Sequence, residues 1–202
     1  MTQVSGKISK ALVKDWTISP KNSATRGCCY LRLGGGKGTI LAALCQEYPN
    51  IQGILMETPG TAQRAREYVR QVGLDERIQV VEGDFFQALP PVLATCDVFF
   101  SRPSFMIGGD EDCVKIIRNI RHVASRPHAK LAAHDIVMGV DGNAKHLEYE
   151  KILRNLSMMC FCEGERMSKE FFQLFSQARL PSLPKLIKFR DLTSVVEVDL
   201  TT

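Results

Sequence analysis

Residues 29–33 read Cys-Tyr-Leu-Arg-Leu, and residues 34–38 read Gly-Gly-Gly-Lys-Gly. The first stretch is mostly apolar, as in a buried strand, and residues 39–48 have the spacing of an amphipathic helix. Glycines let the backbone turn tightly and approach a ligand closely, while free amides at the start of the helix face a negative or polar group. The pattern predicts the first unit of an α/β sheet with a ligand at its glycine turn. A tight turn without a ligand is the alternative.

The rest of the chain alternates strand-like runs with segments of helical period. The predicted strands cover 29–33, 53–56, 78–82, 97–100, 129–136, 186–189 and 194–200. The predicted helices cover 39–48, 61–72, 111–124, 147–159 and 168–177. This alternation predicts a doubly wound, mostly parallel sheet, and the two last strands predict a terminal hairpin with an antiparallel final strand. Asp110 is expected to cap the helix that follows it.

Length and composition bound the class of protein. The chain has 202 residues, of which 45% are hydrophobic and 24% charged, so we expect one globular domain. No apolar run is long enough for a membrane span, and the first residues lack a signal peptide, so a cytoplasmic location is expected by default. The net charge of +4 comes from scattered basic residues and does not support nucleic-acid binding. Seven cysteines without metal-site spacing are expected to be reduced thiols, with no bound metal.

Two further features fall at the ends of predicted strands. Glu57 ends the second strand, where such folds place an acid that accepts hydrogen bonds from ribose hydroxyls. Asp84 and Phe85 follow the third strand, where a carboxylate can accept from an adenine amino group and a ring can stack on the base. The alternative for Asp84 is a turn cap. With Gly34, Gly36 and Gly38, these residues predict a nucleoside site at the carboxyl edge of the sheet.

The motifs that carry these features resemble, in this order, those of the small-molecule O-methyltransferase family. They are Leu33-Gly34-Gly35-Gly36-Lys37-Gly38, Met56-Glu57-Thr58-Pro59, Gly83-Asp84-Phe85-Phe86, Asp110-Glu111-Asp112 and Glu165-Arg166-Met167-Ser168-Lys169-Glu170-Phe171. The last is similar to the family's Glu-Arg-Thr-x-x-Glu-Trp segment. The family consists of class I, S-adenosylmethionine-dependent enzymes of plant, fungal and bacterial secondary metabolism. The resemblance implies a seven-stranded Rossmann-like methyltransferase domain at 29–202, after a short N-terminal helical extension at 1–28.

The resemblance also implies the ligand and its contacts. It implies that S-adenosylmethionine is held by the glycine turn, its ribose by Glu57, and its adenine by Asp84 and Phe85. A basic residue follows the fourth strand in the family, and Arg102 is the match here, with a solvated loop residue as the alternative.

The chain departs from the family at the catalytic base. Met106 stands where the family has a histidine, and a thioether does not accept a proton near neutral pH. The carboxylates that position this histidine are matched by Asp135 and Glu165, which we expect to orient a substrate or to act as the base. A strand-end polar residue and a surface helix-entry residue are the respective alternatives. His134 is expected to point to the opposite face of its strand, away from Asp135.

Two more departures concern the cofactor and the assembly. Arg32 stands where the family has an acidic residue, and a positive charge near the sulfonium is unfavourable unless the side chain points away or meets the cofactor carboxylate. The family's long N-terminal helical region, which makes the dimer and covers the acceptor, is not found in the 202 residues. We therefore expect a homo-oligomer or a protein partner to replace it.

Three functions are compatible with these features. The first is O-methylation of a small phenolic or polyketide-like metabolite. The second is a methyltransferase-fold enzyme that no longer methylates and instead catalyses a cyclisation, dehydration or rearrangement. The third is a non-catalytic accessory partner of a full-length methyltransferase.

Overall fold

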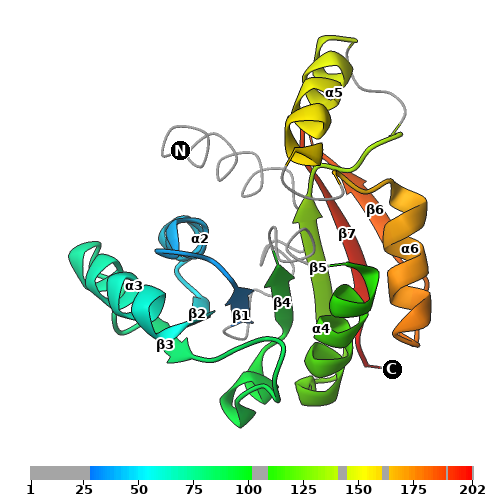
Figure 1. Ribbon diagram of the computed structural model, residues 1–202. Helices are drawn as coiled ribbons and strands as arrows, with labels where there is room; N and C mark the ends of the chain where they lie inside the picture. The colour runs from blue at the N-terminus through cyan, green and yellow to red at the C-terminus, as the bar shows by residue number, and fades with distance from the viewer. Residues whose placement is uncertain (1–27, 102–108, 141–144, 161–163, 190, 202) are drawn as a thin grey trace.

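The computed structural model describes residues 28–101, 109–140, 145–160, 164–189 and 191–201 (Figure 1). Within these residues, seven strands form one sheet in the order β3-β2-β1-β4-β5-β7-β6. The strands are β1 (Cys28–Leu33), β2 (Ile51–Glu57), β3 (Ile78–Glu82), β4 (Val98–Ser101), β5 (Lys130–Asp135), β6 (Lys185–Lys188) and β7 (Ser194–Asp199). The helices are α2 (Thr39–Glu47), α3 (Pro59–Gln71), η2 (Pro91–Thr95), α4 (Asp110–Val123), α5 (Lys145–Met159) and α6 (Ser168–Gln177).

Strand direction places the carboxyl ends of the first five strands at one edge of the sheet. The first five strands are parallel, whereas β7 is antiparallel to both β5 and β6. The predicted mostly parallel sheet and the antiparallel terminal strand are therefore confirmed. Leu33 is in register with Met56 and with Ser101, so the ends of β1, β2 and β4 lie side by side. Ligands of open α/β sheets bind at this carboxyl edge.

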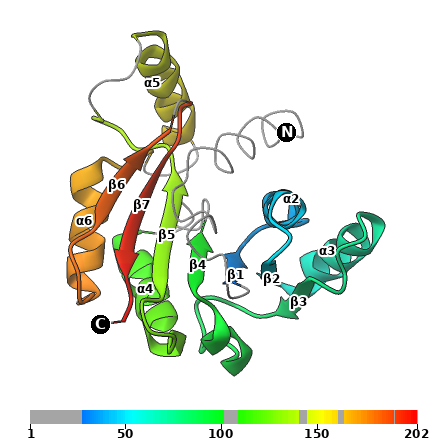
Figure 2. The same ribbon diagram turned by 180° about the vertical axis from the view of Figure 1, so that it is seen from behind.

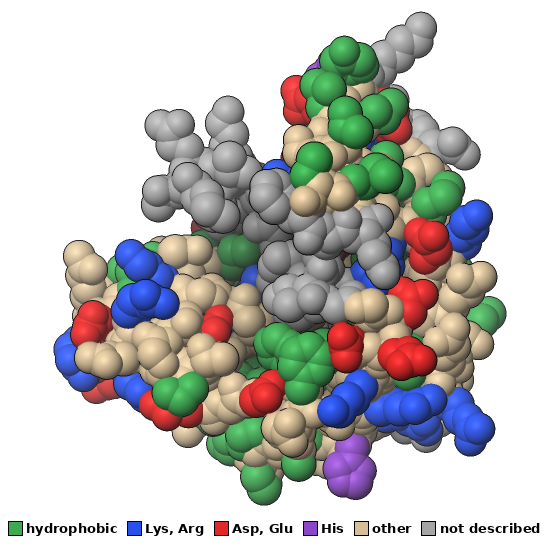
Figure 3. Space-filling view, viewed as in Figure 1, with side chains coloured by type: hydrophobic (Ala, Val, Ile, Leu, Met, Phe, Trp, Pro, Cys, Tyr) green, Lys and Arg blue, Asp and Glu red, His purple; other side chains and the backbone are tan. Residues whose placement is uncertain are grey.

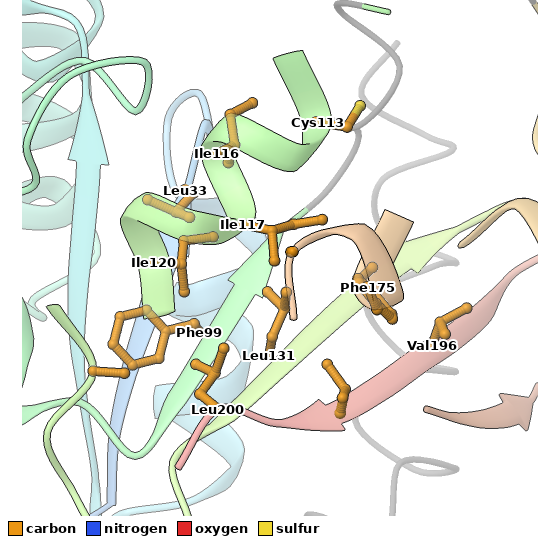
Figure 4. Close-up of a cluster of buried hydrophobic side chains, with 14 of the residues drawn as sticks. Leu33, Phe99, Cys113, Ile116, Ile117, Ile120, Leu131, Phe175, Val196 and Leu200 are labelled. Carbon is orange, nitrogen blue, oxygen red and sulfur yellow. The ribbon is translucent and has the colours of Figure 1, made fainter. Parts of the chain in front are cut away.

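Two hydrophobic clusters cover the two faces of the sheet. One joins α4 and α6 to the inward side chains of β1, β4, β5 and β7, with Ile117 and Phe175 among its fully buried members (Figure 4). The other joins α2 and α3 to the opposite side of β1 and β2. Seen from both sides, α4 and α6 lie over the β5–β6 half of the sheet, while α5 stands beyond the end of β5 (Figures 1 and 2).

Several helix ends differ from the sequence prediction. α3 begins at Pro59, two residues early, because proline is well suited to the first turn of a helix, where its missing N–H costs nothing. The expectation that Asp110 caps α4 is wrong: Gly109 is the N-cap, and Asp110 is already helical and pairs with Arg166. The 3₁₀ helix η2 was not predicted. α3 ends at Gln71, and Gly73 follows its C-cap residue Val72 with a φ of 69° in the left-handed region, as is common after a helix.

Several sequence expectations lie outside the described residues. These are the N-terminal extension up to residue 27, including its predicted helix at 8–16, and the residues Arg102 and Met106. In the part of the chain that the structure describes, no helix combines the length and the apolar character needed to cross a membrane.

Candidate active site at the carboxyl edge

The glycine turn links β1 to α2 in a conformation that needs glycine. Gly34, Gly36 and Gly38 have φ values of 58°, 60° and 84°, in the left-handed region that L-residues rarely adopt. Gly35 has a different reason, because a Cβ there would lie 2.5 Å from Cγ of Arg32 and 2.7 Å from Cδ1 of Leu55. At the corresponding position of Gly36, no atom of the described residues lies within 4 Å. Gly35 thus packs on the sheet, whereas Gly36 faces a space that no described residue fills.

Glu57 reaches this turn from the end of β2. Its Oε1 accepts a hydrogen bond of 2.5 Å from the amide of Gly36, and the amide of Gly34 donates to the carbonyl of Met56 at 3.3 Å. A carboxylate has about four acceptor positions, so Glu57 retains capacity for other donors. The sequence-predicted acid and glycine turn therefore form one unit.

The N-terminus of α2 opens at the same place. Its N-cap is Gly38, which has no side chain to cap the helix. The first hydrogen bond of the helix runs from the amide of Ala42 to the carbonyl of Gly38, at 2.9 Å. The amides of the preceding helical residues are left for other acceptors, and the helix dipole makes this end attractive to negative or polar groups.

The loop after β3 is ordered by its own side chains. Oδ1 of Asp84 accepts from the amide of Phe86 at 2.9 Å, which is the turn-cap geometry considered as the alternative. The second carboxylate oxygen of the exposed Asp84 is not used in this turn. Asn119 of α4 donates to the carbonyls of Phe85 and Gln87, both at 3.0 Å, and so fixes the loop. This role of Asn119 could not be predicted from the sequence, because an asparagine within a helix gives no signal of a contact with Phe85, 34 positions away.

Arg32 packs against the Gly35 backbone of the glycine turn and against Phe100. It is 4% exposed, its guanidinium lies 4.9 Å from the centroid of the Phe100 ring, and it donates to the carbonyl of Leu33 at 3.3 Å. A cation against an aromatic face is stabilised by the ring quadrupole. The Arg32 cation is therefore buried between the Gly35 backbone and the Phe100 ring.

Asp135 and Glu165 lie on neighbouring extended segments. Met138 forms a parallel bridge with Met167, and its amide donates to the carbonyl of Arg166 at 3.0 Å. The two acids are 6% and 8% exposed. Glu165 is therefore not the surface residue considered as the alternative. Oδ1 of Asp135 accepts from the amide of Ile136 at 2.9 Å.

The Glu165 segment is anchored by three neighbours. Nε of Arg154 on α5 lies 3.5 Å from Oε1 of Glu165, and Oδ1 of Asn155 accepts from the Glu165 amide at 2.6 Å. Arg166 pairs with Asp110 at 2.9 Å and so connects the segment to the start of α4. These contacts fix the position of the Glu165 segment between α5 and the start of α4.

A buried lysine lies behind these acids. Lys151 of α5 is 1% exposed, donates to the carbonyl of Val137 at 3.2 Å, and lies 3.8 Å from Glu148. Burial lowers the pKa of Lys151 below its ordinary value, against the opposing charge of Glu148. Lys151 could not be singled out from the sequence, because a lysine within a helix gives no signal that it is buried.

His134 lies on the other face, as predicted from strand alternation. It is fully buried, stacks 5.6 Å from the Phe100 ring, and its Nε2 lies 2.9 Å from Oγ1 of Thr193. Among the described residues, no group of three or more His, Cys, Asp or Glu side chains is arranged to hold a metal ion.

The chain is similar in sequence to proteins of known family. A family model described as an O-methyltransferase domain matches residues 22–180. The mitomycin biosynthesis 6-O-methyltransferase of Streptomyces lavendulae is 30% identical over 148 residues, which are 73% of this chain and 40% of the relative. The aclacinomycin 10-hydroxylase RdmB of Streptomyces purpurascens is 34% identical over 140 residues, 69% of this chain and 36% of the relative.

A solved structure agrees with the sequence relatives. The SAH-bound form of CalO1, a methyltransferase in calicheamicin biosynthesis, superposes with a TM-score of 0.76 at 25% identity, covering 98% of this chain and 55% of CalO1. This chain thus spans about two fifths of the length of the curated relatives it matches.

Proposed function

This chain belongs to the O-methyltransferase domain family, whose members depend on S-adenosylmethionine, and we propose that it transfers a methyl group to a hydroxyl of a small secondary metabolite. The proposed acceptor is phenolic or polyketide-like. The unit of glycine turn, Glu57 and open α2 N-terminus is the observation that carries the proposal, because it offers both amide donors and a carboxylate at one point.

We propose that S-adenosylmethionine binds across the ends of β1, β2 and β3. The open space at Gly36 admits the cofactor close to the backbone. Glu57 accepts from the ribose hydroxyls, and Asp84 accepts from the adenine amino group through the oxygen that its turn leaves unused. The Phe85 ring contacts the base. Arg102 completes the proposed cofactor residues, although it lies outside the described part of the chain.

Asp135 and Glu165 are the proposed catalytic residues. The bound cofactor supplies an electrophilic methyl group on a sulfonium, and the acceptor oxygen must lie in line with it. As the new C–O bond forms, the methyl C–S bond would break and the hydroxyl proton would leave, and a carboxylate of this pair would accept that proton. Glu165 is held by Arg154 and Asn155, which suits it to orient the acceptor. Asp135 then takes the proton.

Transfer of a labelled methyl group tests this reaction. We expect purified protein to move label from S-adenosylmethionine to a member of a phenol panel, and Asp135→Asn to reduce the rate by about 10²-fold, the usual contribution of a general base. Asp75→Asn, which changes an exposed aspartate at the opposite edge of the sheet, should leave the rate unchanged. Equal rates for wild type and Asp135→Asn would contradict the assignment.

A second candidate is a family member that binds the cofactor but has changed its reaction. It is favoured by Met106 in place of the family's histidine and by a relative that is named as a hydroxylase. The two candidates differ in one readout. Cofactor binding without methyl transfer to any acceptor of the panel would support the second.

The proposed assembly is a homo-oligomer that forms through α5. Along one face, α5 exposes five apolar side chains (Figure 3). They are Tyr149, Ile152, Leu153, Leu156 and Met159, which are between 49% and 65% exposed. Their spacing of three or four residues makes a continuous stripe, and contiguous exposed apolar surface marks a contact site. We take the partner to be a second copy of this chain, because a two-fold axis would pack the same stripe of both copies together. Within the chain, we propose that 29–202 is the methyltransferase domain and 1–28 its extension.

A further inference from the structure

Two thiols lie against each other at the amino edge of the sheet, opposite the candidate active site. Cys29 is near the start of β1, and Cys96 follows η2 just before β4. Their Sγ atoms are 3.3 Å apart. The proposed methyltransferase chemistry does not use either residue.

The backbone holds the two cysteines at a separation that a disulfide spans. The carbonyl of Cys29 accepts from the amide of Asp97 at 2.9 Å, and the Cys29 amide donates to Oδ2 of Asp97 at 2.9 Å. These bonds extend the parallel pairing of β1 and β4 by one residue, to Cys29 and Asp97. Cys96, the residue before Asp97, therefore lies diagonally from Cys29. Strand spacing and rise place Cα atoms in this diagonal relation about 6 Å apart, within the usual disulfide range. An S–S bond therefore requires only a small approach of the two sulfurs.

The pair is open to small reactants on one side. Cys29 is half-buried and lines a depression of about 440 Å³ together with Thr95 and Arg126. Cys96 is fully buried behind it. An oxidant that enters the depression meets Cys29 first. The oxidised Cys29 sulfur then faces the sulfur of Cys96.

Hydrogen bonding across the pair favours reaction at Cys29. The hydrogen bond with Cys96 lowers the pKa of Cys29 and outweighs burial, which raises it. The hydrogen bond with Thr95 and the charge of Arg126 also lower this pKa, while the charge of Asp97 raises it. The bond with Cys29, together with burial, raises the pKa of Cys96. By contrast, burial raises the pKa of the Cys45 thiol to about 11. The thiolate is the reactive form of cysteine, so Cys29 is the expected nucleophile.

We propose that Cys29 and Cys96 form a redox-active dithiol that a hydroperoxide converts to an intramolecular disulfide. The Cys29 thiolate attacks one peroxide oxygen, breaks the O–O bond and becomes a sulfenic acid, and the leaving oxygen takes a proton to give water or an alcohol. The Cys96 sulfur then attacks the sulfenic sulfur, its proton leaves with the hydroxyl as water, and the S–S bond forms. Both sulfurs are oxidised and the peroxide is reduced.

The disulfide would close a loop that contains the candidate cofactor site. Cys29 and Cys96 are 67 positions apart, and the glycine turn, Glu57 and Asp84 all lie between them. A crosslink that closes a long loop restricts the unfolded chain and stabilises the fold. Oxidation should therefore raise the midpoint of thermal unfolding by several degrees, and dithiothreitol should reverse the shift.

Peptide mapping of the oxidised full chain tests the proposal without relying on variants. After brief hydrogen peroxide treatment and blocking of free thiols with N-ethylmaleimide, we expect one crosslinked peptide pair, with fragment ions that assign the bond to Cys29 and Cys96. The neighbouring Cys28 provides a matched control. Cys28→Ser should keep the crosslink and the thermal shift, while Cys29→Ser and Cys96→Ser should lose both.

Two results would overturn the proposal. One is a Cys96 that stays fully labelled by N-ethylmaleimide while Cys29 advances to sulfinic or sulfonic acid. The other is a crosslink to Cys28 or a spread of crosslinks over several cysteines. Neither result depends on methyl transfer, so they are independent of the proposed function.

Discussion

At the scale of single residues, adjacent glycines of one turn have different physical roles. Gly35 lacks a side chain because Arg32 and Leu55 occupy the space, whereas Gly36 lacks one because its φ is 60° and, in our proposal, because the cofactor comes close. The sequence predicts a glycine turn but does not assign these roles, since they depend on which strand residues pack beneath it.

Paired alanine variants separate the two roles. Gly35→Ala should lower the free energy of unfolding by about 1–3 kcal/mol through overpacking and leave cofactor affinity almost unchanged. Gly36→Ala should cost about 1–2 kcal/mol of backbone strain and also weaken cofactor binding at least tenfold. Urea unfolding and calorimetry measure the two quantities. Equal loss of affinity in both variants would argue against close approach at Gly36.

At the scale of elements, the pairing of β5 with β7 includes a partly buried ion pair. Nζ of Lys130 lies 2.6 Å from Oε1 of Glu197, which is 7% exposed, and 3.7 Å from Asp199. Burial acts to lower the pKa of Lys130, but the hydrogen bond and charge of Glu197 outweigh it and raise the pKa above 10.5.

Removing the lysine should destabilise this half of the sheet in a pH-dependent way. Lys130→Met leaves Glu197 without its cation, which should cost about 1–3 kcal/mol of unfolding free energy near neutral pH. Because the folded-state pKa of Lys130 is raised, its contribution is fully present below pH 10.5 and is lost as pH rises through the folded pKa. The difference between wild type and variant in urea unfolding should therefore shrink at strongly alkaline pH. A pH-independent difference would show that the ion pair is not its source.

The apolar stripe of α5 gives a second prediction at this scale. Leu156→Glu places a charge in the middle of the stripe and should convert the homo-oligomer to monomer, as measured by light scattering during gel filtration. Leu183→Glu is the matched control, because Leu183 is 92% exposed and lies outside α5. A wild-type chain that is monomeric at high concentration would contradict the proposed assembly.

At the scale of the whole molecule, local pattern and long-range contact explain what the sequence does and does not predict. The doubly wound, mostly parallel sheet and its terminal hairpin follow from periodicity. The placement of Glu57 and the glycine turn at one edge follows from the shared direction of parallel strands. The contacts of Asn119, Arg166 and Cys29 do not, because each joins segments 34 to 67 positions apart and depends on packed helices and strands. For Asp84 the structure adds a turn that the sequence left as one of two interpretations, and its role in binding adenine stays a prediction.

Calorimetric titration with S-adenosylmethionine tests the central claim, that the carboxyl edge is a cofactor site, most directly. We predict saturable binding to the wild-type chain and at least a tenfold loss of affinity in Glu57→Gln. Glu82→Gln is the control, since Glu82 is in register with Glu57 on the next strand but pairs with Arg66, and its affinity should be unchanged. The absence of binding at millimolar ligand, or equal affinity in Glu57→Gln and wild type, would contradict the account.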